Sequence, residues 1–264
     1  MMNTFLKPLL RRAAPWALAL ATALGLAAQA QAQAQITAPS VPAASADDMT
    51  PRVAACVTCH GRDGQATNSG YFPRIAGKPA GYLYEQLRSF RDGRRQQPAM
   101  QHLLANLNDA YLREMAEYFA RQDLPYPPPA PSDLNEPVLA HGQKLVREGD
   151  RTRGIPACVS CHGAALTGVE PGIPSLLGLP RLYIASQLGA WLTGDRRALA
   201  PDCMAEVGHQ LNQADIQAVA GWLSTQAVPS PAHAATSLPH PLPKPCSAQG
   251  SVAVAPAASA GAPR

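Results

Sequence analysis

The sequence is poor in aromatic and charged residues, and it has no apolar run of the roughly 20 residues that a membrane span needs. Aromatic residues make up 5% and charged residues 15% of the 264 residues. So few aromatic side chains leave a small domain short of apolar surface for its core. Basic residues exceed acidic ones by only four. This balance is not typical of proteins that bind nucleic acid, and we expect no such partner.

The first 30 residues have the features of a secretory signal peptide. Lys7, Arg11 and Arg12 precede an apolar run over residues 13–28, and a small-x-small cleavage signal ends at Ala30. The alternatives are a retained anchor, for which the run is short, and a twin-arginine signal, whose sequence context is absent after Arg12. We therefore expect cleavage near Ala30, a periplasmic protein and no transmembrane anchor in its mature form.

Segments rich in Pro, Ala, Gln or Ser divide the rest of the chain. Residues 31–48 predict a flexible lead-in, residues 123–137 a Pro-rich linker in which a helix cannot continue, and residues 227–264 a Pro/Ala-rich tail without a core of its own. Between them lie two predicted domains, over residues 49–122 and 138–226.

The two predicted domains are copies of one another. Cys-Val-Thr-Cys-His-Gly at residues 56–61 matches Cys-Val-Ser-Cys-His-Gly at residues 158–163, and residues 82–93 match residues 183–194. After an insertion of three residues the offset is 104, and it aligns Met100 with Met204. An internal repeat of this kind indicates two tandem domains of one fold.

Apolar residues recur at helical spacing in both copies. Leu83, Leu87 and Phe90 lie at i, i+4 and i+7, and the aligned positions in the second copy are also apolar. Asn108 and Asn212 are suitable N-caps for a last helix in each copy, and residues 141–147 predict an extra helix in the second. No segment has a convincing strand pattern. The sequence predicts an all-α fold.

Each copy contains Cys-x-x-Cys-His, the attachment motif of c-type haem. Two thiols one helical turn apart can bond one edge of the porphyrin, and the next residue can present its imidazole to the iron. A structural disulfide, a redox-active dithiol or a zinc site are the alternatives, but two copies, each followed by His, disfavour them. We expect two covalent haem c groups, held by Cys56, Cys59 and His60 and by Cys158, Cys161 and His162.

The second axial ligand of each iron is expected on a loop downstream. Met100 and Met204 align with one another, and a thioether would raise the haem potential. Met115 fits a helix core better, and His102 and His209 have no histidine counterpart in the other copy. We predict Met100 and Met204 as ligands.

Further residues are candidates for a supporting role. Pro73 and Pro174 lie in matching loops, where a carbonyl could orient the ligating imidazole. Arg94, Arg95, Arg196 and Arg197 could pair with haem propionates or be solvated.

Cys203 and Cys246 remain after the haem motifs. In an oxidising compartment a disulfide between them is expected, and closing its loop would contribute about 4 kcal/mol. The alternative makes Cys203 a thiolate ligand of the second haem.

Both motifs, the Pro loops, the Tyr-x-x-x-Gln-Leu helices and the Met segments resemble the di-haem cytochromes c of the cytochrome c4 type, over about residues 49–226. The resemblance implies two class I cytochrome c folds, His/Met ligation and periplasmic electron delivery toward a terminal oxidase. The Cys203/Cys246 pair and the long tail depart from it, which leaves the redox partner open.

The leading hypothesis is an electron carrier and not an enzyme, with a dehydrogenase, a bc-type complex or a terminal oxidase as redox partners and association with membrane complexes through them. Outer-sphere transfer requires both Met ligands, because nothing else should then bind iron. The alternatives are a haem enzyme, either a sulfur-compound dehydrogenase or a di-haem peroxidase, and a cytochrome subunit of a dehydrogenase complex.

Overall fold

The computed structural model describes residues 48–67, 71–129, 131–248 and 253–254. The expected signal peptide (1–30) and the lead-in (31–48, apart from Asp48) lie outside these ranges, so both stay predictions. The two copies of the repeat belong to one compact unit. None of the helices in the described ranges is long and apolar enough to cross a membrane.

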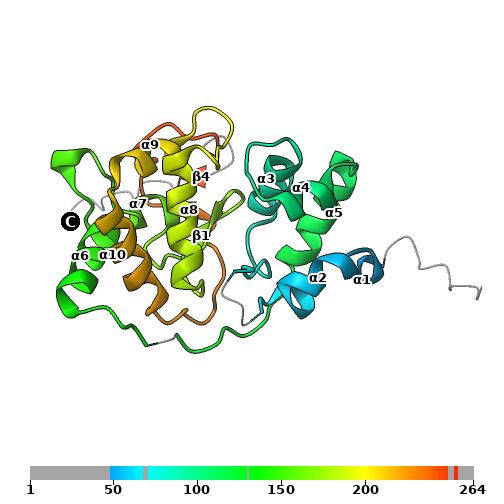
Figure 1. Cartoon of the computed structure of the whole chain (residues 1–264), viewed down its shortest axis with the longest axis horizontal. Helices are drawn as coiled ribbons and strands as arrows, with labels where there is room; N and C mark the ends of the chain where they lie inside the picture. Colours follow the sequence, from blue (N-terminus) through cyan, green and yellow to red (C-terminus); the bar gives the residue numbers. More distant parts are fainter. Residues whose placement is uncertain (1–47, 68–70, 130, 249–252, 255–264) are drawn as a thin grey trace, which may run out of the picture. The chain divides into compact units, whose positions relative to one another are not determined.

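The two halves of the chain are mainly helical, as predicted (Figure 1). The α-helices of the first half, among its described residues, are α1 (Met49–Arg52), α2 (Ala54–His60), α3 (Ala80–Arg91), α4 (Pro98–Leu104) and α5 (Asp109–Ala120). Those of the second half are α6 (Glu136–Arg147), α7 (Val159–His162), α8 (Arg181–Thr193), α9 (Cys203–Gln210) and α10 (Gln213–Ser224). Short 3-10 turns follow α2 at Arg62–Gly64 and α6 at Arg151–Arg153.

The apolar stripes predicted from the sequence form the two cores. In the first half α3 packs against α5, where Leu83, Phe90 and Met115 are buried in one cluster. In the second half α10 packs between α6 and α8, and Ile184 and Leu188 lie in the corresponding cluster. Met115 is therefore a core residue, as predicted.

Helix α6 can approach α10 closely because Gly142 faces it. A Cβ at Gly142 would collide with the backbone carbonyl of Ala218 in α10. In the first half, the first helix among the described residues is α1, which has only four residues. The close α6–α10 contact thus gives the second half a larger core than the first.

The structure corrects two expectations about secondary structure. Short strands are present: β1 (Gly168–Val169) pairs antiparallel with β2 (Ile173–Pro174), and β3 (Ser237–Leu238) pairs parallel with β4 (Ala253–Val254). Two residues are too few to produce an alternating pattern in a sequence. The extra helix begins at Glu136 and not at His141, because Asn135 caps it and a proline is tolerated in the first helical turn.

The predicted caps Asn108 and Asn212 are confirmed. The Asn108 side chain accepts a hydrogen bond from the backbone of Tyr111, and Asn212 forms a reciprocal capping box with Asp215. Asp215 is 2% exposed and also accepts hydrogen bonds from His141 Nε2 (2.8 Å) and Arg153 Nη1 (2.7 Å). Burial opposes its ionisation, but these donors outweigh burial and lower the pKa of Asp215 to about 2. One carboxylate thus links α6, the following 3-10 turn and α10.

Asp215→Asn should lower the free energy of unfolding at pH 7 by about 2 kcal/mol. The folded-state pKa of Asp215 lies below the unfolded value, so its stabilisation is present above about pH 4 and is lost as pH falls toward 2. The difference between the two proteins should shrink over that interval. Urea unfolding of the holoprotein, followed by circular dichroism at several pH values, measures it. Glu148→Gln, at an exposed carboxylate, is the control. A loss that does not depend on pH would contradict this account.

Candidate haem sites

Each Cys-x-x-Cys-His motif forms a helical turn that presents its three functional side chains together. In the first half Cys56, Cys59 and His60 all lie in α2. In the second half Cys158 precedes α7 as its N-cap, and its carbonyl accepts the backbone N–H of Cys161 (3.2 Å) and of His162 (2.9 Å). This local geometry is what two thioether bonds to one porphyrin edge require.

The glycine after each histidine ends the helix and reverses the chain. Gly61 and Gly163 have φ angles of 76° and 81°, a region that side chains with a Cβ rarely adopt. At Gly61 a Cβ would also collide with the carbonyl of Ala66. The reversal leads the chain back under the histidine to the proline loop.

Each imidazole contacts the backbone carbonyl of a proline in the loop that follows its motif. His60 Nδ1 lies 2.8 Å from the carbonyl oxygen of Pro73, and His162 Nδ1 lies 2.8 Å from that of Pro174. A carbonyl oxygen can only accept a hydrogen bond, so Nδ1 carries the proton and donates the hydrogen bond. The lone pair on Nε2 is then free for a metal, which is the usual tautomer of a ligating histidine.

Both imidazoles are also kept neutral. Burial lowers the pKa of His60 and of His162, although the proline carbonyls act in the opposite direction. Arg95 lowers the pKa of His60 further, and Lys78 and Arg196 lower that of His162. A neutral imidazole is the form that coordinates iron, so each site is preorganised for it.

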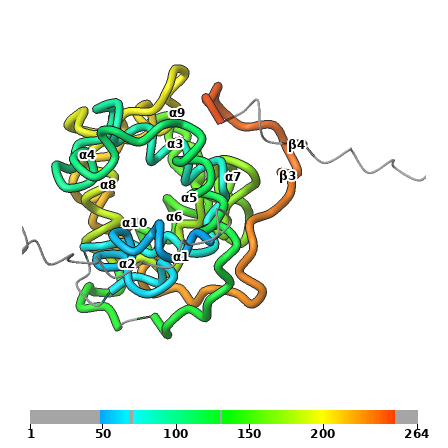
Figure 2. The backbone as a smooth tube through the Cα atoms, turned by 90° about the vertical axis from the view of Figure 1, so that its right-hand side faces the viewer, coloured from blue at the N-terminus to red at the C-terminus, as the bar shows by residue number. Residues whose placement is uncertain are grey.

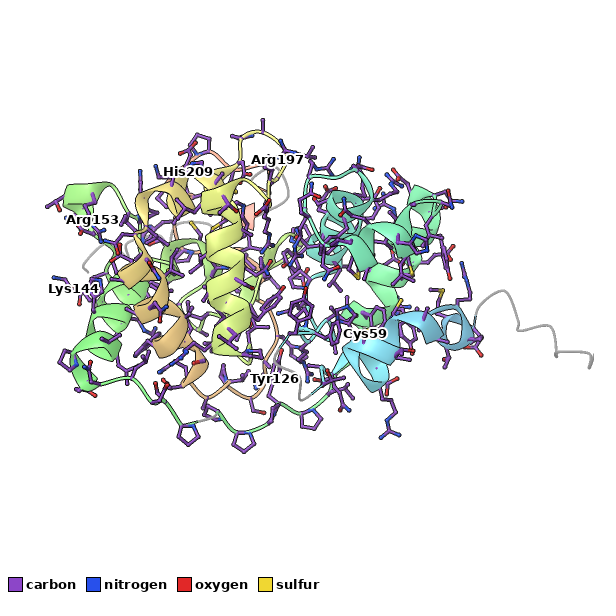
Figure 3. The ribbon with its side chains drawn as sticks, in the orientation of Figure 1. Cys59, Tyr126, Lys144, Arg153, Arg197 and His209 are labelled. Carbon is purple, nitrogen blue, oxygen red and sulfur yellow. A yellow bond between two sulfur atoms is a disulfide. The ribbon has the colours of Figure 1, made fainter. Side chains whose placement is uncertain are left out.

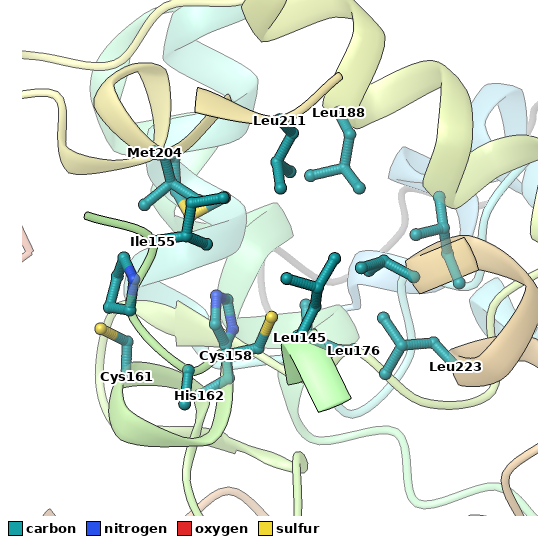
Figure 4. A pocket seen from close by; sticks show the side chains of 15 residues that line it. Leu145, Ile155, Cys158, Cys161, His162, Leu176, Leu188, Met204, Leu211 and Leu223 are labelled. Atoms are coloured by element: carbon teal, nitrogen blue, oxygen red, sulfur yellow. The ribbon is translucent and has the colours of Figure 1, made fainter. Parts of the chain in front are cut away.

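An apolar cavity lies in front of the second motif (Figure 4). Its cavity volume is about 70 Å³. Figure 4 shows Cys158, Cys161 and His162 at one end and Met204 at the other. Aliphatic side chains line the walls: Leu145, Ile155, Leu176, Ile184, Leu188, Val207, Leu211, Val219 and Leu223. These residues fit a haem, whose faces are apolar.

The first half brings its own set together. Cys56 and Met100 pack against the same buried cluster, which includes Leu83 and Phe90. Met100 and Met204 are partly buried, and they lie in short helices, α4 and α9, and not on loops as expected. Gln97 and Asp202, which accept hydrogen bonds from Ala99 and Ala205, cap these helices and begin them before the methionine.

The other candidate ligands point away from the sites. His102 and His209 are exposed, and Figure 3 shows His209 on the outer side of α9. Cys203 is not a free thiolate, because it forms a disulfide with Cys246, with Cα atoms 4.9 Å apart. Its role as a ligand of the second haem therefore has no support in the structure.

The motif cysteines do not have the properties of a redox-active dithiol or of a zinc site. Burial raises the pKa of Cys158 to about 12, with a smaller effect from Cys161, and raises that of Cys56. Reactive thiols have a lowered pKa. Within the described ranges no group of three His, Cys, Asp or Glu residues could hold a metal ion.

A polar cluster that was not predicted from the sequence joins the two halves. Arg95 Nη2 donates to Tyr183 Oη (3.0 Å) and Gln187 Oε1 (2.6 Å), and Arg196 Nη2 donates to Tyr82 Oη (3.3 Å) and Gln86 Oε1 (2.9 Å). The pairs are equivalent in the repeat, so the cluster has pseudo-two-fold symmetry. The sequence feature that could have predicted this cluster is the Tyr-x-x-x-Gln pattern followed by Arg, which is present in both copies.

The charges in this cluster lack an acidic partner. Arg95, Arg196 and Lys78 are 8%, 6% and 5% exposed, and no carboxylate in the described part of the chain forms an ion pair with them. Burial lowers the pKa of Arg196, and Arg95 beside it lowers that pKa further. Buried cations are costly unless an anion compensates them. Arg197, by contrast, is exposed.

Two helical halves, each with a Cys-x-x-Cys-His turn and an oriented neutral imidazole, define a di-haem c-type cytochrome. Residues 52–119 match the family model described as cytochrome C oxidase, cbb3-type, subunit III. The chain is 36% identical over 187 residues to the thiosulfate dehydrogenase electron acceptor of Thiomonas intermedia, covering 71% of this chain and 85% of that protein. It is 33% identical over 174 residues to cytochrome c4 of Pseudomonas aeruginosa, covering 65% and 84%.

A solved structure is similar as well. The crystal structure of reduced cytochrome c4 from Pseudomonas stutzeri aligns with a TM-score of 0.59 and 30% identity, over 67% of this chain and 96% of that chain. The chain belongs to the cytochrome c4 family. It is an electron carrier with two covalent haem c groups, and its relatives are electron-transfer cytochromes and not enzymes.

Proposed function

We propose that the protein is a periplasmic carrier that accepts electrons from a thiosulfate dehydrogenase. The observation that carries this proposal is the similarity to an electron acceptor of that enzyme, of which the chain covers 85%. The predicted signal peptide supports the location. Its partners are redox proteins. From the dehydrogenase, the electrons would pass through this carrier to a terminal oxidase, the acceptor that the resemblance to cytochrome c4 implies.

Met100 and Met204 complete the two iron sites in this proposal. They are aligned in the repeat, and each is partly buried at the start of a short capped helix. Met204 shares a cavity with His162, and Met100 shares an apolar cluster with Cys56. A thioether on each iron leaves no position for an exogenous ligand, as a carrier requires.

Arg95 and Arg196 compensate haem propionates in this proposal. Both guanidinium groups are buried without an acidic partner among the described residues, and Arg95 lowers the pKa of His60 as Arg196 lowers that of His162. The haem propionates would supply the missing negative charges. A cation near a haem favours its reduced form, so the cluster would raise both potentials.

The dehydrogenase partner is tested by mixing the oxidised holoprotein with a purified thiosulfate dehydrogenase and thiosulfate. We expect both haems to be reduced, as followed by the visible absorption of ferrous haem c. Reactions without the dehydrogenase should show no reduction, because the chain is a carrier. A quinol-oxidising bc-type complex is the comparison donor. Reduction by that complex alone would contradict the proposed donor.

Met100→Ala and Met204→Ala should each leave two haems attached but remove one iron–thioether charge-transfer band. The potential of the altered haem should fall by at least about 0.1 V, because axial ligands set haem potentials over a wide range. Potentiometry and near-infrared spectra measure both effects. Met115→Ala, at a core methionine, is the matched control. Unchanged bands in the Met100 and Met204 variants would contradict the ligand assignment.

Arg95→Gln and Arg196→Gln should each lower a haem potential by roughly 60 mV, a tenfold change in a one-electron equilibrium. Glutamine keeps hydrogen-bonding capacity but removes the positive charge. Arg197→Gln, at an exposed arginine, should have a much smaller effect. If Arg95→Gln and Arg196→Gln change the haem potentials no more than Arg197→Gln does, the proposed compensation of the propionates is excluded.

A further inference from the structure

The chain after α10 crosses the second half as a strap, defined as residues 227–248. Its first attachment lies at β1: Ala235 donates its N–H to the carbonyl of Gly168 (2.9 Å) and accepts the N–H of Glu170 (2.8 Å). Leu238 is 2% exposed and packs in one cluster with Val169 and Ile173. Figure 2 shows this segment, in orange to red, along the outside of the helices.

The second attachment of the strap lies at the start of α9. The disulfide joins Cys246 to Cys203, the first residue of α9. The N–H of Ser247 donates to the carbonyl of Pro201 (2.8 Å), and Lys244 Nζ lies 3.3 Å from a carboxylate oxygen of Glu206. A covalent bond and an ion pair therefore hold the first turn of α9, and a backbone hydrogen bond holds the chain just before it.

The two attachments of the strap lie next in sequence to Pro174 and to Met204, the residues on the histidine side and the methionine side of the second haem site. Ile173 is next to Pro174, whose carbonyl holds His162, and the two form strand β2. Cys203 is next to Met204, which faces the same cavity as His162. One segment is thus anchored on the histidine side and on the methionine side of the second haem site.

Among the described residues, no segment crosses the first half as the strap crosses the second. The residue aligned with Cys203 is Ala99, and the chain after α5 continues through the linker to α6. The two sites therefore share their ligands and histidine supports but differ in what restrains the methionine helix.

Helix α9 requires external restraint. It has eight residues, too few for a helix to be stable alone in water. Its C-terminal part packs on α8, where Gly208 faces Trp191. Its first turn, which carries Met204, follows an exposed loop that includes Leu199. The strap is attached at that first turn, where local opening would release the methionine.

We propose that the strap is a positioning device that keeps Met204 on the second iron, and that the Cys203–Cys246 bond makes this haem resist ligand exchange. The inference rests on the proposed ligation by Met204. Without the bond, α9 should open locally more often, and an external ligand should compete for the iron more successfully. The first haem should not respond.

The test compares the wild-type holoprotein with Cys203→Ser, Cys246→Ser and the double variant. Imidazole binding to the oxidised haems is titrated, and NMR signals of the haem-bound methionine methyl groups report each site separately. All three variants should bind imidazole at the second haem roughly tenfold more tightly. This change is smaller than the full stabilisation that a disulfide closing a long loop can contribute. Binding at the first haem should be unchanged.

The single variants separate the bond from its residues. An effect in Cys203→Ser but not in Cys246→Ser would mean that residue 203 acts through its own contacts, and would overturn the proposal. The double variant shows whether a freed thiol binds the iron. Leu238→Ala, which loosens the other attachment and keeps the disulfide, should have a smaller effect in the same direction.

Two results distinguish failure of this inference from failure of the proposed ligation. If Met204→Ala leaves the thioether bands intact, the ligand assignment itself is wrong. If Met204→Ala opens the second iron while the three serine variants bind imidazole as the wild type does, only the strap's role is refuted. Equal gains at both haems would also refute it, because they would indicate a general loss of stability.

Discussion

The hydrogen bond from each motif histidine to a proline carbonyl is the constraint on which both sites depend. It fixes the tautomer, it orients the ring, and it requires the chain to return under the histidine within 12 or 13 residues. Gly61 and Gly163 make that return possible through their positive φ angles. Burial of the same imidazoles keeps them neutral. A haem ligand is thus prepared by backbone geometry and desolvation together, with the nearby cations Arg95 and Arg196 acting in the same direction as burial.

The two halves meet this constraint with different amounts of support. In the first half Ile75 packs against the cluster around Leu83 and Phe90, and Gly77 donates its N–H to the carbonyl of Phe119 in α5 (2.9 Å). In the second half the loop pairs as β1 and β2, the strap packs on it, and α6 adds a further layer against α10. A repeated sequence therefore produces two sites with the same histidine support and different packing around it.

Much of this arrangement follows from the sequence because it depends on local patterns. The haem motifs, the apolar stripes and the caps Asn108 and Asn212 each act within a few residues, and a repeat shows every pattern twice. The short strands, the helical setting of Met204 and the cluster around Arg95 depend on contacts between distant segments. Helix α6 began earlier than expected because Asn135 is the stronger cap, although Pro137 suggested the linker.

Contacts within each half and contacts between the halves have different roles in electron transfer. The proposed ligands of each iron come from one half of the chain, so each haem would be held by its own domain. The buried cations Arg95 and Arg196 instead reach across, and each bonds glutamines of both halves. Separation of the halves would leave the guanidinium groups without half of their acceptors, so the cluster disfavours relative movement of the two halves. Under the proposed compensation of the haem propionates, the same shared charge would favour the reduced state of either haem and would couple the electrostatics of the two sites to the rigidity of their junction.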